Sequence, residues 1–406
     1  MSFEYHVQPL KGAFLLWTVF STLLIYLPYW LISSLKPSWR PRSSWGWGRV
    51  FGVHVLQVFV HSAFKTGLPA AAQSSETAEK AAKDTGFVWL APTPDLVVGE
   101  IKTIAESNDV QVQRVPAYWY GSRGSNGEVG QKAGQDEKIV YQLHGGGYVM
   151  GHAGPKDLMN PAICCGFIEH IGQVERVFSV EYRLSSADPF KPANPFPTAL
   201  IDAIAGYSYL ISTVGFRPEN IIISGDSAGG NLAISLTRYL VSSGLPAIPP
   251  PGLLLLLSPT TEWVLTHVGP DSSLERNTPS DYCRPFFDGY PAKALVGKMA
   301  LDEASTNIWI SPGSLKAQHV PGTFAGFPPT CINAGEAEFQ LDSVATFRRR
   351  LVADIGAENV TYIETFGGTH DFIGLAMCEP ERTEALREIS AWVMSAWPPT
   401  AQPFSP

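Results

Sequence analysis

The stretch that most constrains the fold of this chain runs from residue 221 to 236, where a strand pattern changes directly into a helix pattern. Three β-branched residues lead into Gly-Asp-Ser-Ala-Gly at 225–229, and a helical pattern follows from Asn231. Such a short turn forces unusual backbone angles on Ser227, and flanking glycines remove side chains that would collide there. The pattern predicts a serine exposed at a strand end, with a helix N-terminus behind it that favours negative charge. A glycine-rich turn without chemistry is the alternative.

Strand and helix patterns alternate along most of the chain. Strand-like apolar runs occupy residues 96–104, 110–120, 138–143, 177–184, 221–223, 252–259, 329–335 and 359–364. Helical patterns occupy residues 155–171, 196–211, 343–353 and 379–396. This alternation predicts an α/β fold with a mostly parallel central sheet and helices on both of its faces. The polar, glycine-rich loop 121–137 is expected to join two strands as a hairpin.

The alternation stops between residues 260 and 326, where aromatic residues and prolines are scattered among polar ones. A long insertion after a core strand is usually functional. We therefore expect residues 260–326 to form a lid over the site, with surface decoration as the alternative.

Residues 12–35 form an apolar run of 24 residues without a charge, followed by four cations, Lys36, Arg40, Arg42 and Arg49. A helix of this length spans a bilayer with some tilt, so a transmembrane anchor is the first interpretation. A helix lying in the membrane interface and an apolar cap helix are the alternatives. The run is too long for a cleaved signal peptide. If the run is a single-pass anchor, the distribution of cations would place the residues after 36 in the cytosol.

These patterns divide the chain into three parts. Residues 1–35 are expected to be a membrane anchor, and residues 36–95 a tether and N-terminal cap region with an amphipathic stretch at 50–59. Residues 96–398 are expected to be the α/β domain that carries the lid.

Composition excludes several classes of function. The net charge is −8 and the only basic cluster flanks the apolar run, so nucleic acid is not an expected partner. The five cysteines are odd in number and lack C-x-x-C spacing, which indicates free thiols. The nine histidines form no zinc-binding pattern, so no metal or other cofactor is expected.

A serine hydroxyl needs a base within hydrogen-bond reach and a carboxylate that orients the base. In a strand–elbow–helix fold these partners follow the serine in the order acid, then histidine, each just past a strand end. His370 follows the strand ending near residue 364 and is the expected base. For the acid, Glu338 fits best, because Glu336 comes too soon after its strand and Asp342, the alternative, belongs to the next helix.

The strand at 138–143 ends in His-Gly-Gly-Gly at 144–147. Such a flexible segment allows backbone N–H groups to turn towards one point, where they would stabilise an oxyanion. The loop backbone rather than the imidazole of His144 is needed for this, so His144 is expected to be a structural hydrogen-bonding residue.

Several of these motifs together resemble the hormone-sensitive lipase family of α/β-hydrolases. They are His-Gly-Gly-Gly at 144–147, Tyr-Arg-Leu at 182–184, Phe-Pro…Asp at 196–202, Gly-Asp-Ser-Ala-Gly-Gly at 225–230 and Gly-x-x-His-x-Phe at 367–372. The similarity runs through residues 138–395, and an anchor ahead of such a domain resembles the membrane-anchored arylacetamide deacetylase branch, which implies the endoplasmic reticulum.

The resemblance implies an esterase with Ser227 as nucleophile, His370 as base and Glu338 as acid. The oxyanion donors would be the backbone N–H groups of Gly146, Gly147 and Ala228, with His144, Gly145 and Asp226 supporting the motifs. The family usually has Asp-Pro-Leu where this chain has Glu-Phe-Gln at 338–340.

The expected substrate is a lipophilic ester with a short acyl group. The first alternative is amide or formamide hydrolysis by the same triad. The second is a ligand-binding protein on an inactive hydrolase fold, which would have no need of His370.

Overall fold

The computed structural model describes residues 2–69 and 75–397, so five residues of the predicted tether and the last residue of the predicted α/β domain lie outside it. Among the described residues, eight strands form one sheet in the order β1-β2-β4-β3-β5-β6-β7-β8. Only the pairs that involve β1 and β2 are antiparallel. The predicted mostly parallel sheet is therefore confirmed. The strands are β1 (Phe87–Leu90), β2 (Val115–Gly121), β3 (Lys138–Leu143), β4 (Val174–Val180), β5 (Ile221–Asp226), β6 (Leu253–Leu257), β7 (Thr330–Gly335) and β8 (Val360–Thr365).

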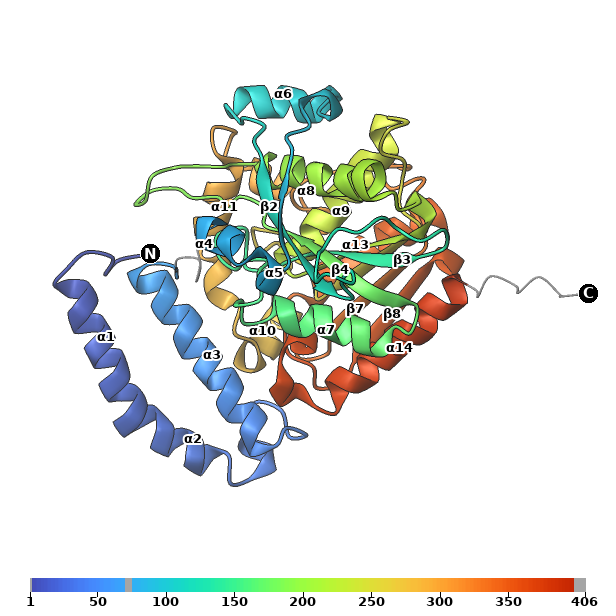
Figure 1. Cartoon of the computed structure of the whole chain (residues 1–406). Coiled ribbons are helices and arrows are strands. Elements are labelled where there is room, and N and C mark those ends of the chain that lie inside the picture. Colours follow the sequence, from blue (N-terminus) through green and yellow to red (C-terminus); the bar gives the residue numbers. More distant parts are fainter. Residues whose placement is uncertain (1, 70–74, 398–406) are drawn as a thin grey trace, which may run out of the picture.

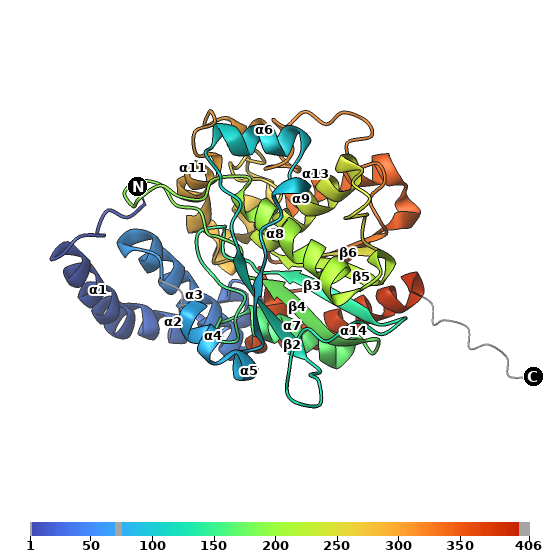
Figure 2. The ribbon, with the colours of Figure 1, turned by 45° about the horizontal axis from the view of Figure 1, so that its top comes forward.

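Helices cover both faces of this sheet, as Figures 1 and 2 show from two directions. One face packs against α7 (Asn160–His170) and α14 (Glu381–Ala396). The other packs against α8 (Thr198–Ser208), α9 (Ala228–Ser243) and α13 (Leu341–Ile355), and α6 (Gly99–Ser107) lies beyond α8 and α9, farther from the sheet (Figure 2). The three-layer arrangement follows from the alternation of strands and helices along the chain.

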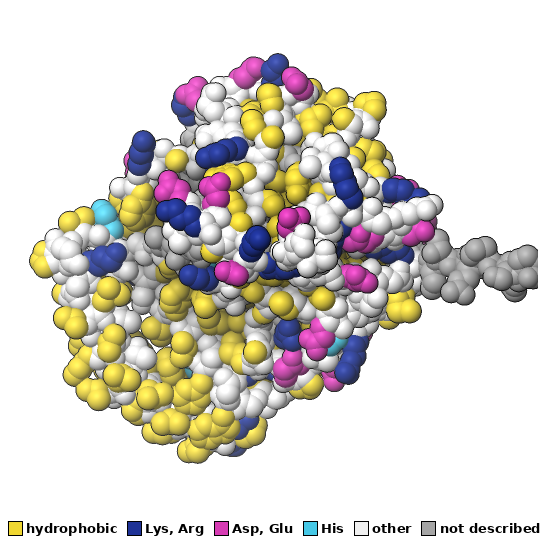
Figure 3. Space-filling view, in the orientation of Figure 1, with side chains coloured by type: hydrophobic (Ala, Val, Ile, Leu, Met, Phe, Trp, Pro, Cys, Tyr) yellow, Lys and Arg dark blue, Asp and Glu magenta, His cyan; other side chains and the backbone are white. Residues whose placement is uncertain are grey.

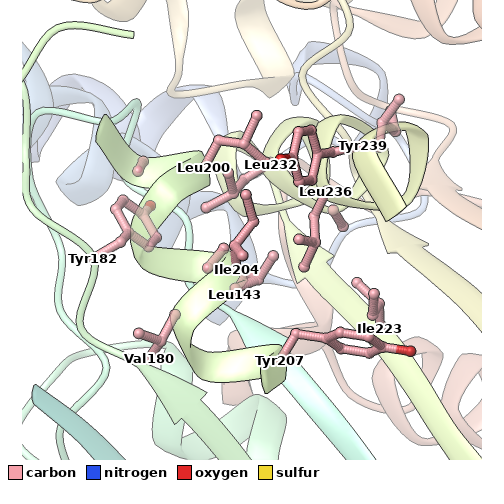
Figure 4. Close-up of a cluster of buried hydrophobic side chains, with 14 of the residues drawn as sticks. Leu143, Val180, Tyr182, Leu200, Ile204, Tyr207, Ile223, Leu232, Leu236 and Tyr239 are labelled. Atoms are coloured by element: carbon pink, nitrogen blue, oxygen red, sulfur yellow. The ribbon is translucent and has the colours of Figure 1, made fainter. Parts of the chain in front are cut away.

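The core follows from the side-chain alternation of the central strands. Ile221 and Ile223 of β5 pack on the α8–α9 side, whereas Ile222 packs on the α7–α14 side. Figure 4 shows the first side, where Leu200 and Ile204 of α8 and Leu232 of α9 lie over the strands. Since both faces are buried, the strands read as continuous apolar runs. Each fully buried side chain of this size stabilises the fold by about 1.5–3 kcal/mol.

Strand register brings the loops of the predicted site to one edge of the sheet. Leu143 at the end of β3 is opposite Gly225 of β5, so the Gly-rich loop lies beside the serine turn. Gly335 at the end of β7 is opposite Thr365 of β8, so the loops that follow these strands are also neighbours. The carboxyl ends of parallel strands are the usual place for a ligand site in such sheets.

The N-terminal segments lie together at one side of the molecule (blue in Figure 1). The helix α1 (Leu10–Ser21) continues through a π-helical segment (Thr22–Tyr26) into α2 (Leu27–Ser33). The resulting helix of 24 residues is long and apolar enough to cross a membrane by length and composition. Beside it lies α3 (Trp47–Thr66), which contains the predicted amphipathic stretch. Two short helices, α4 (Ser75–Lys80) and α5 (Ala82–Thr85), precede β1.

The insertion at 260–326 holds three short helices, α10 (Ser273–Asn277), α11 (Tyr290–Val296) and α12 (Glu303–Thr306), joined by irregular segments.

Two local predictions were wrong, and one strand was not anticipated. The strand expected at 96–104 is the helix α6, because Ile101 and Ala105 have the spacing of a helix and bury one face. The loop 121–137 is not a hairpin connection, since β4 lies between β2 and β3. The short strand β1 in the predicted tether was not anticipated, because four residues are too few for a clear period.

A buried ion pair fixes the start of α8 against the end of β4. The carboxylate of Asp202 is 1% exposed and accepts hydrogen bonds from the backbone N–H and the guanidinium of Arg183, at 2.7–2.9 Å. Removing one partner of such a pair leaves a buried charge without its counterpart.

We expect Asp202→Ala to lower the free energy of unfolding by about 3–5 kcal/mol, because the Arg183 guanidinium and N–H would lose their acceptor. Urea unfolding followed by tryptophan fluorescence measures the change. Asp136→Ala is the matched control, since its pair with Arg217 is about half exposed on both sides and should contribute below about 1 kcal/mol. Equal losses of unfolding free energy in the two variants would show that the buried Asp202–Arg183 pair stabilises the fold no more than an exposed pair does.

Candidate active site

Ser227 occupies a strained turn between β5 and α9. Its backbone angles, φ 51° and ψ −116°, lie where residues other than glycine are rarely found. A side chain at Gly225 would collide with the carbonyl of Gly229, and one at Gly229 would collide with the carbonyl of Leu143. The glycines therefore allow the turn to close, and the Ser227 side chain lies at the N-terminus of α9.

His370 lies in the loop after β8 and reaches Ser227 across the sheet edge. Its Nε2 is 2.8 Å from the Ser227 hydroxyl oxygen, and its Nδ1 is 3.2 Å from a carboxylate oxygen of Glu338. The imidazole and the Glu338 side chain are each 1% exposed. The structure thus brings together the three side chains from which the sequence predicted a triad.

The carboxylate of Glu338 is held by more than the imidazole. Its other oxygen accepts hydrogen bonds from the Ser258 hydroxyl at 2.6 Å and from the Gly335 N–H at 2.5 Å. Asp342, the alternative acid, lies in the first turn of α13, where it accepts the N–H of Ser273 at 2.7 Å.

Two residues of the insertion form hydrogen bonds that hold the loop carrying Glu338. Neither was singled out from the sequence. Asp281 accepts the N–H groups of Cys283 at 2.9 Å and Phe339 at 3.0 Å. Asn277 donates its side-chain amide to the backbone carbonyl of Glu338 at 2.7 Å. Ser258 was also missed, although its place directly after β6 could have indicated it.

The Gly-rich loop faces Ser227 with free backbone donors. Gly146 and Gly147 have φ of 104° and 66°, and a side chain at Gly147 would collide with Phe286. Within the described part of the chain, no hydrogen bond uses the N–H groups of Gly146, Gly147 or Ala228. The N–H of Gly145 is different, since it donates to Asp226 at 2.9 Å. These free donors lie on the two segments that flank the serine.

His144 supports this loop. Its ring stacks on Tyr182 with centroids 4.1 Å apart, and its Nδ1 is 2.8 Å from the carbonyl of Gly145. Tyr182 donates its hydroxyl hydrogen to the carbonyl of His144 at 2.6 Å. Burial lowers the pKa of His144 to about 4, so the ring is neutral at pH 7. The expected structural role agrees with these contacts.

A second carboxylate lies close to the imidazole of His370. Asp371 places an oxygen 3.4 Å from Nε2 of His370. Burial alone would lower the pKa of His370, but Asp371, the Cys283 side chain and Glu338 together raise that pKa above its ordinary value. Burial raises the pKa of Asp371 as well, and the neighbouring His370 opposes that shift.

Two spaces of very different size adjoin Ser227. A cavity of about 480 Å³ is lined by apolar side chains of α3, of the loop before α7 and of the insertion, among them Phe59, Val60, Met150, Met159 and Phe286. A second space of about 10 Å³ is lined by Gly147, Thr260, Trp263, Cys283, Phe286 and Phe287. The first has room for a large apolar group and the second for about one water-sized group.

The cover of the site combines two distant segments of the chain. Phe64 of α3 and Phe286 of the insertion pack edge to face, with ring centroids 4.8 Å apart. Residues of α3 and of the insertion both line the larger cavity. Among the residues that the structure describes, no group of three His, Cys, Asp or Glu side chains is arranged to hold a metal ion.

Comparisons with known proteins agree with this architecture. An esterase of Acinetobacter venetianus is 28% identical over 276 residues, which cover 67% of this chain and 80% of the relative. The crystal structure of carboxyl esterase 2 from the fungus Tuber melanosporum superposes with a TM-score of 0.59 at 20% identity, over 85% of this chain and 98% of that one. An esterase of the bacterial hormone-sensitive lipase family gives a TM-score of 0.55 at 19% identity, over 85% and 97%.

The predicted α/β-hydrolase fold is thereby confirmed, and the resemblance to hormone-sensitive lipase relatives recurs among the solved structures. The membrane-anchored branch stays a prediction. A family model described as the alpha/beta hydrolase fold matches residues 140–374, well over half of the chain. The chain therefore belongs to the α/β-hydrolase fold family.

Proposed function

We propose that this protein is a serine carboxylic-ester hydrolase with Ser227 as nucleophile, His370 as general base and Glu338 as the acid that orients the base. The observation that carries the proposal is the unbroken series of contacts from the Ser227 hydroxyl through the imidazole to the carboxylate, at 2.8 and 3.2 Å. The strained turn supports it, because strain of this kind is concentrated at functional sites. The esterase names of the relatives agree with the reaction.

The mechanism follows from these positions. His370 takes the proton of the Ser227 hydroxyl while its oxygen attacks the ester carbonyl, and Glu338 stabilises the resulting imidazolium. The N–H groups of Gly146, Gly147 and Ala228 are the proposed donors to the oxyanion of the tetrahedral intermediate. His370 then protonates the leaving alcohol. A water molecule, activated by the same imidazole, releases the acid from the acyl-enzyme and restores Ser227.

The two unequal spaces beside Ser227 support a substrate with a short acyl group and a large lipophilic alcohol. The small space between Trp263, Phe286 and Phe287 fits an acetyl methyl group but not a longer chain. The large cavity carries apolar and thioether side chains, which adapt to varied apolar shapes.

The division into an anchor at 1–35, a tether and cap at 36–95 and a hydrolase domain at 96–398 belongs to this proposal. The apolar helix of α1 and α2 supports attachment to a membrane. The endoplasmic reticulum stays a prediction from the resemblance.

We expect Ser227→Ala to lower kcat/KM for p-nitrophenyl acetate by about four to six orders of magnitude, because no other hydroxyl occupies the turn. Glu338→Gln should lower it by about 10³–10⁴, since the imidazole loses its negative partner. Asp342→Asn is the control and should stay within about threefold of the wild type, because its contact is with α10. Wild-type activity that survives in Ser227→Ala would refute the nucleophile assignment.

The raised pKa of His370 sets the pH dependence. Only the neutral imidazole accepts the serine proton, so activity should rise with pH through a midpoint above the ordinary histidine value of 6.5. Asp371→Asn removes a charge that favours the imidazolium, so the midpoint should move to lower pH. Asparagine tolerates the left-handed backbone at this position, φ 51°. The pH profile of kcat/KM measures the effect. An unmoved midpoint would show that Asp371 does not raise the pKa of His370.

The size of the small space predicts acyl selectivity. Wild-type protein should prefer p-nitrophenyl acetate over the hexanoate, and Phe287→Ala should reduce that preference by about 10- to 200-fold, because the truncated side chain opens the space. Phe366→Ala is the control, since that ring is 69% exposed and lines neither space. If the control and Phe287→Ala had the same chain-length profile, the acyl group would have to occupy the other cavity.

A further inference from the structure

The helix of α1 and α2 presents an apolar face to solvent. Its 24 residues have a mean hydropathy of 1.7 in the most apolar window, and only 11% of that window is buried. Figure 3 shows hydrophobic side chains gathered over this part of the molecule, with few charges among them. The large exposed side chains include Leu16, Val19, Phe20, Leu23, Leu24 and Ile32.

The opposite face of the same helix turns inward and carries both hydroxyl and aromatic side chains. Thr18, Ser21 and Thr22 line a space of about 560 Å³ that α3 and the insertion enclose from the other side. Across it, α3 contributes His54 and Gln57. The helix therefore directs an apolar face away from the protein and a mixed face towards α3. An exposed apolar face on a helix that is docked along its other side is suited to burial in a membrane interface.

The beginning of this helix is fastened to the catalytic domain. The N–H groups of Phe3 and Tyr5 donate to the carbonyls of Phe64 and Lys65, at 2.5 and 2.9 Å. The ring of Phe3 is 1% exposed and packs edge to face on Tyr290 of α11, with centroids 4.6 Å apart. The chain before α1 is thus tied to the C-terminal end of α3 and to the insertion.

The other end is fastened to the same domain. Arg40 donates to the carbonyls of Ser34 and Trp45, at 2.9 and 2.7 Å. The fully buried Trp45 donates its indole N–H to the carbonyl of Gly367, at 2.7 Å, in the loop that carries His370. The chain after α2 is thus tied to the N-terminal end of α3.

These two attachments are incompatible with a helix that crosses a bilayer alone. A helix of 24 residues is about 36 Å long and α3 is about 30 Å long. The two helices contact each other towards both ends, where Phe14 lies near His61 and Trp30 packs on His54. A spanning helix has its ends on opposite sides of a hydrocarbon core of about 30 Å. Phe3 and Trp45 would then have to leave their sites, or the charged catalytic domain would have to enter the core.

The mouth of the larger cavity continues the exposed apolar face. Phe59 of α3 and Leu158 of the loop before α7 line this cavity and are 39% and 76% exposed. Val55, one turn before Phe59, is also exposed and lies between the cavity side of α3 and the side that contacts α1 and α2. The apolar surface therefore runs from the helix to the entrance above Ser227.

We propose that the helix of α1 and α2 lies flat in one leaflet of a lipid bilayer rather than across it, and that the larger cavity opens into that leaflet. A lipophilic ester dissolved in the bilayer then reaches Ser227 without crossing water. The entry route rests on the proposed ester hydrolysis, whereas the orientation of the helix rests on the attachments of Phe3 and Trp45 alone.

Nitroxide depth measurements on the full chain in phosphatidylcholine vesicles test the orientation. Leu16→Cys, Leu23→Cys and Ile32→Cys are labelled singly in a Cys165→Ser background, since Cys165 is the exposed native thiol among the described residues. A flat helix places all three labels at a similar depth, about 5–10 Å below the headgroups. A spanning helix places the label at Leu23 about 13 Å deeper than the label at Ile32, nine residues away.

A label at Thr18 is the internal control. In the flat arrangement it faces α3 and should show much weaker oxygen contact than the neighbouring Leu16 label. Graded depths, or a Thr18 label as exposed to lipid as its neighbours, would overturn the proposal.

Hydrolysis of the water-soluble p-nitrophenyl acetate by the same labelled proteins separates this inference from the function. Active proteins with graded depths refute the flat helix and leave the esterase proposal standing. Equal depths support the flat helix whether or not the ester is cleaved, and equal depths without cleavage refute ester hydrolysis and the entry route with it.

Discussion

The close contact between the turn after β5 and the end of β3 is the constraint on which the site depends. Gly229 lies so near the carbonyl of Leu143 that no side chain fits between them. This contact holds the start of α9 beside the Gly-rich loop, so Ala228 and the glycines of that loop lie on neighbouring segments. The energy stored in the backbone of Ser227 is offset by the apolar packing of α9 on the sheet.

Much of this arrangement could be predicted from sequence, because strand ends and glycine motifs have direct geometric meaning. A strand that runs into a glycine-flanked serine and then a helix defines the turn, and parallel strands place His370 and Glu338 at the same edge. The braces of Glu338 could not be predicted, since Ser258, Asn277 and Asp281 come together only through the path of the insertion. The helix α6 was missed because its short apolar run fits either period.

The site concentrates negative charge around a single imidazole. Glu338 and Asp371 contact His370, and Asp281 of the insertion lies near His370 and Glu338. Burial raises the pKa of Asp281 and of Asp226, the latter to about 7. Burying carboxyl groups costs stability unless hydrogen bonds and counter-charges compensate. The backbone hydrogen bonds to these carboxyl groups therefore reduce the free-energy cost of burying them. The large apolar core supplies the remaining stability of the fold.

The burial of Phe3 joins the N-terminal segment and the cover of Ser227 into one structural unit. A chain shortened to begin after α2 would lose this ring from the cluster that it forms with Phe64, Phe190 and Tyr290. That cluster supports the cover of Ser227. A fragment that begins after α2 would therefore have a less tightly packed cover over the site. Fusions and truncations at the N-terminus are therefore expected to change substrate recognition, because they disturb the packing over Ser227.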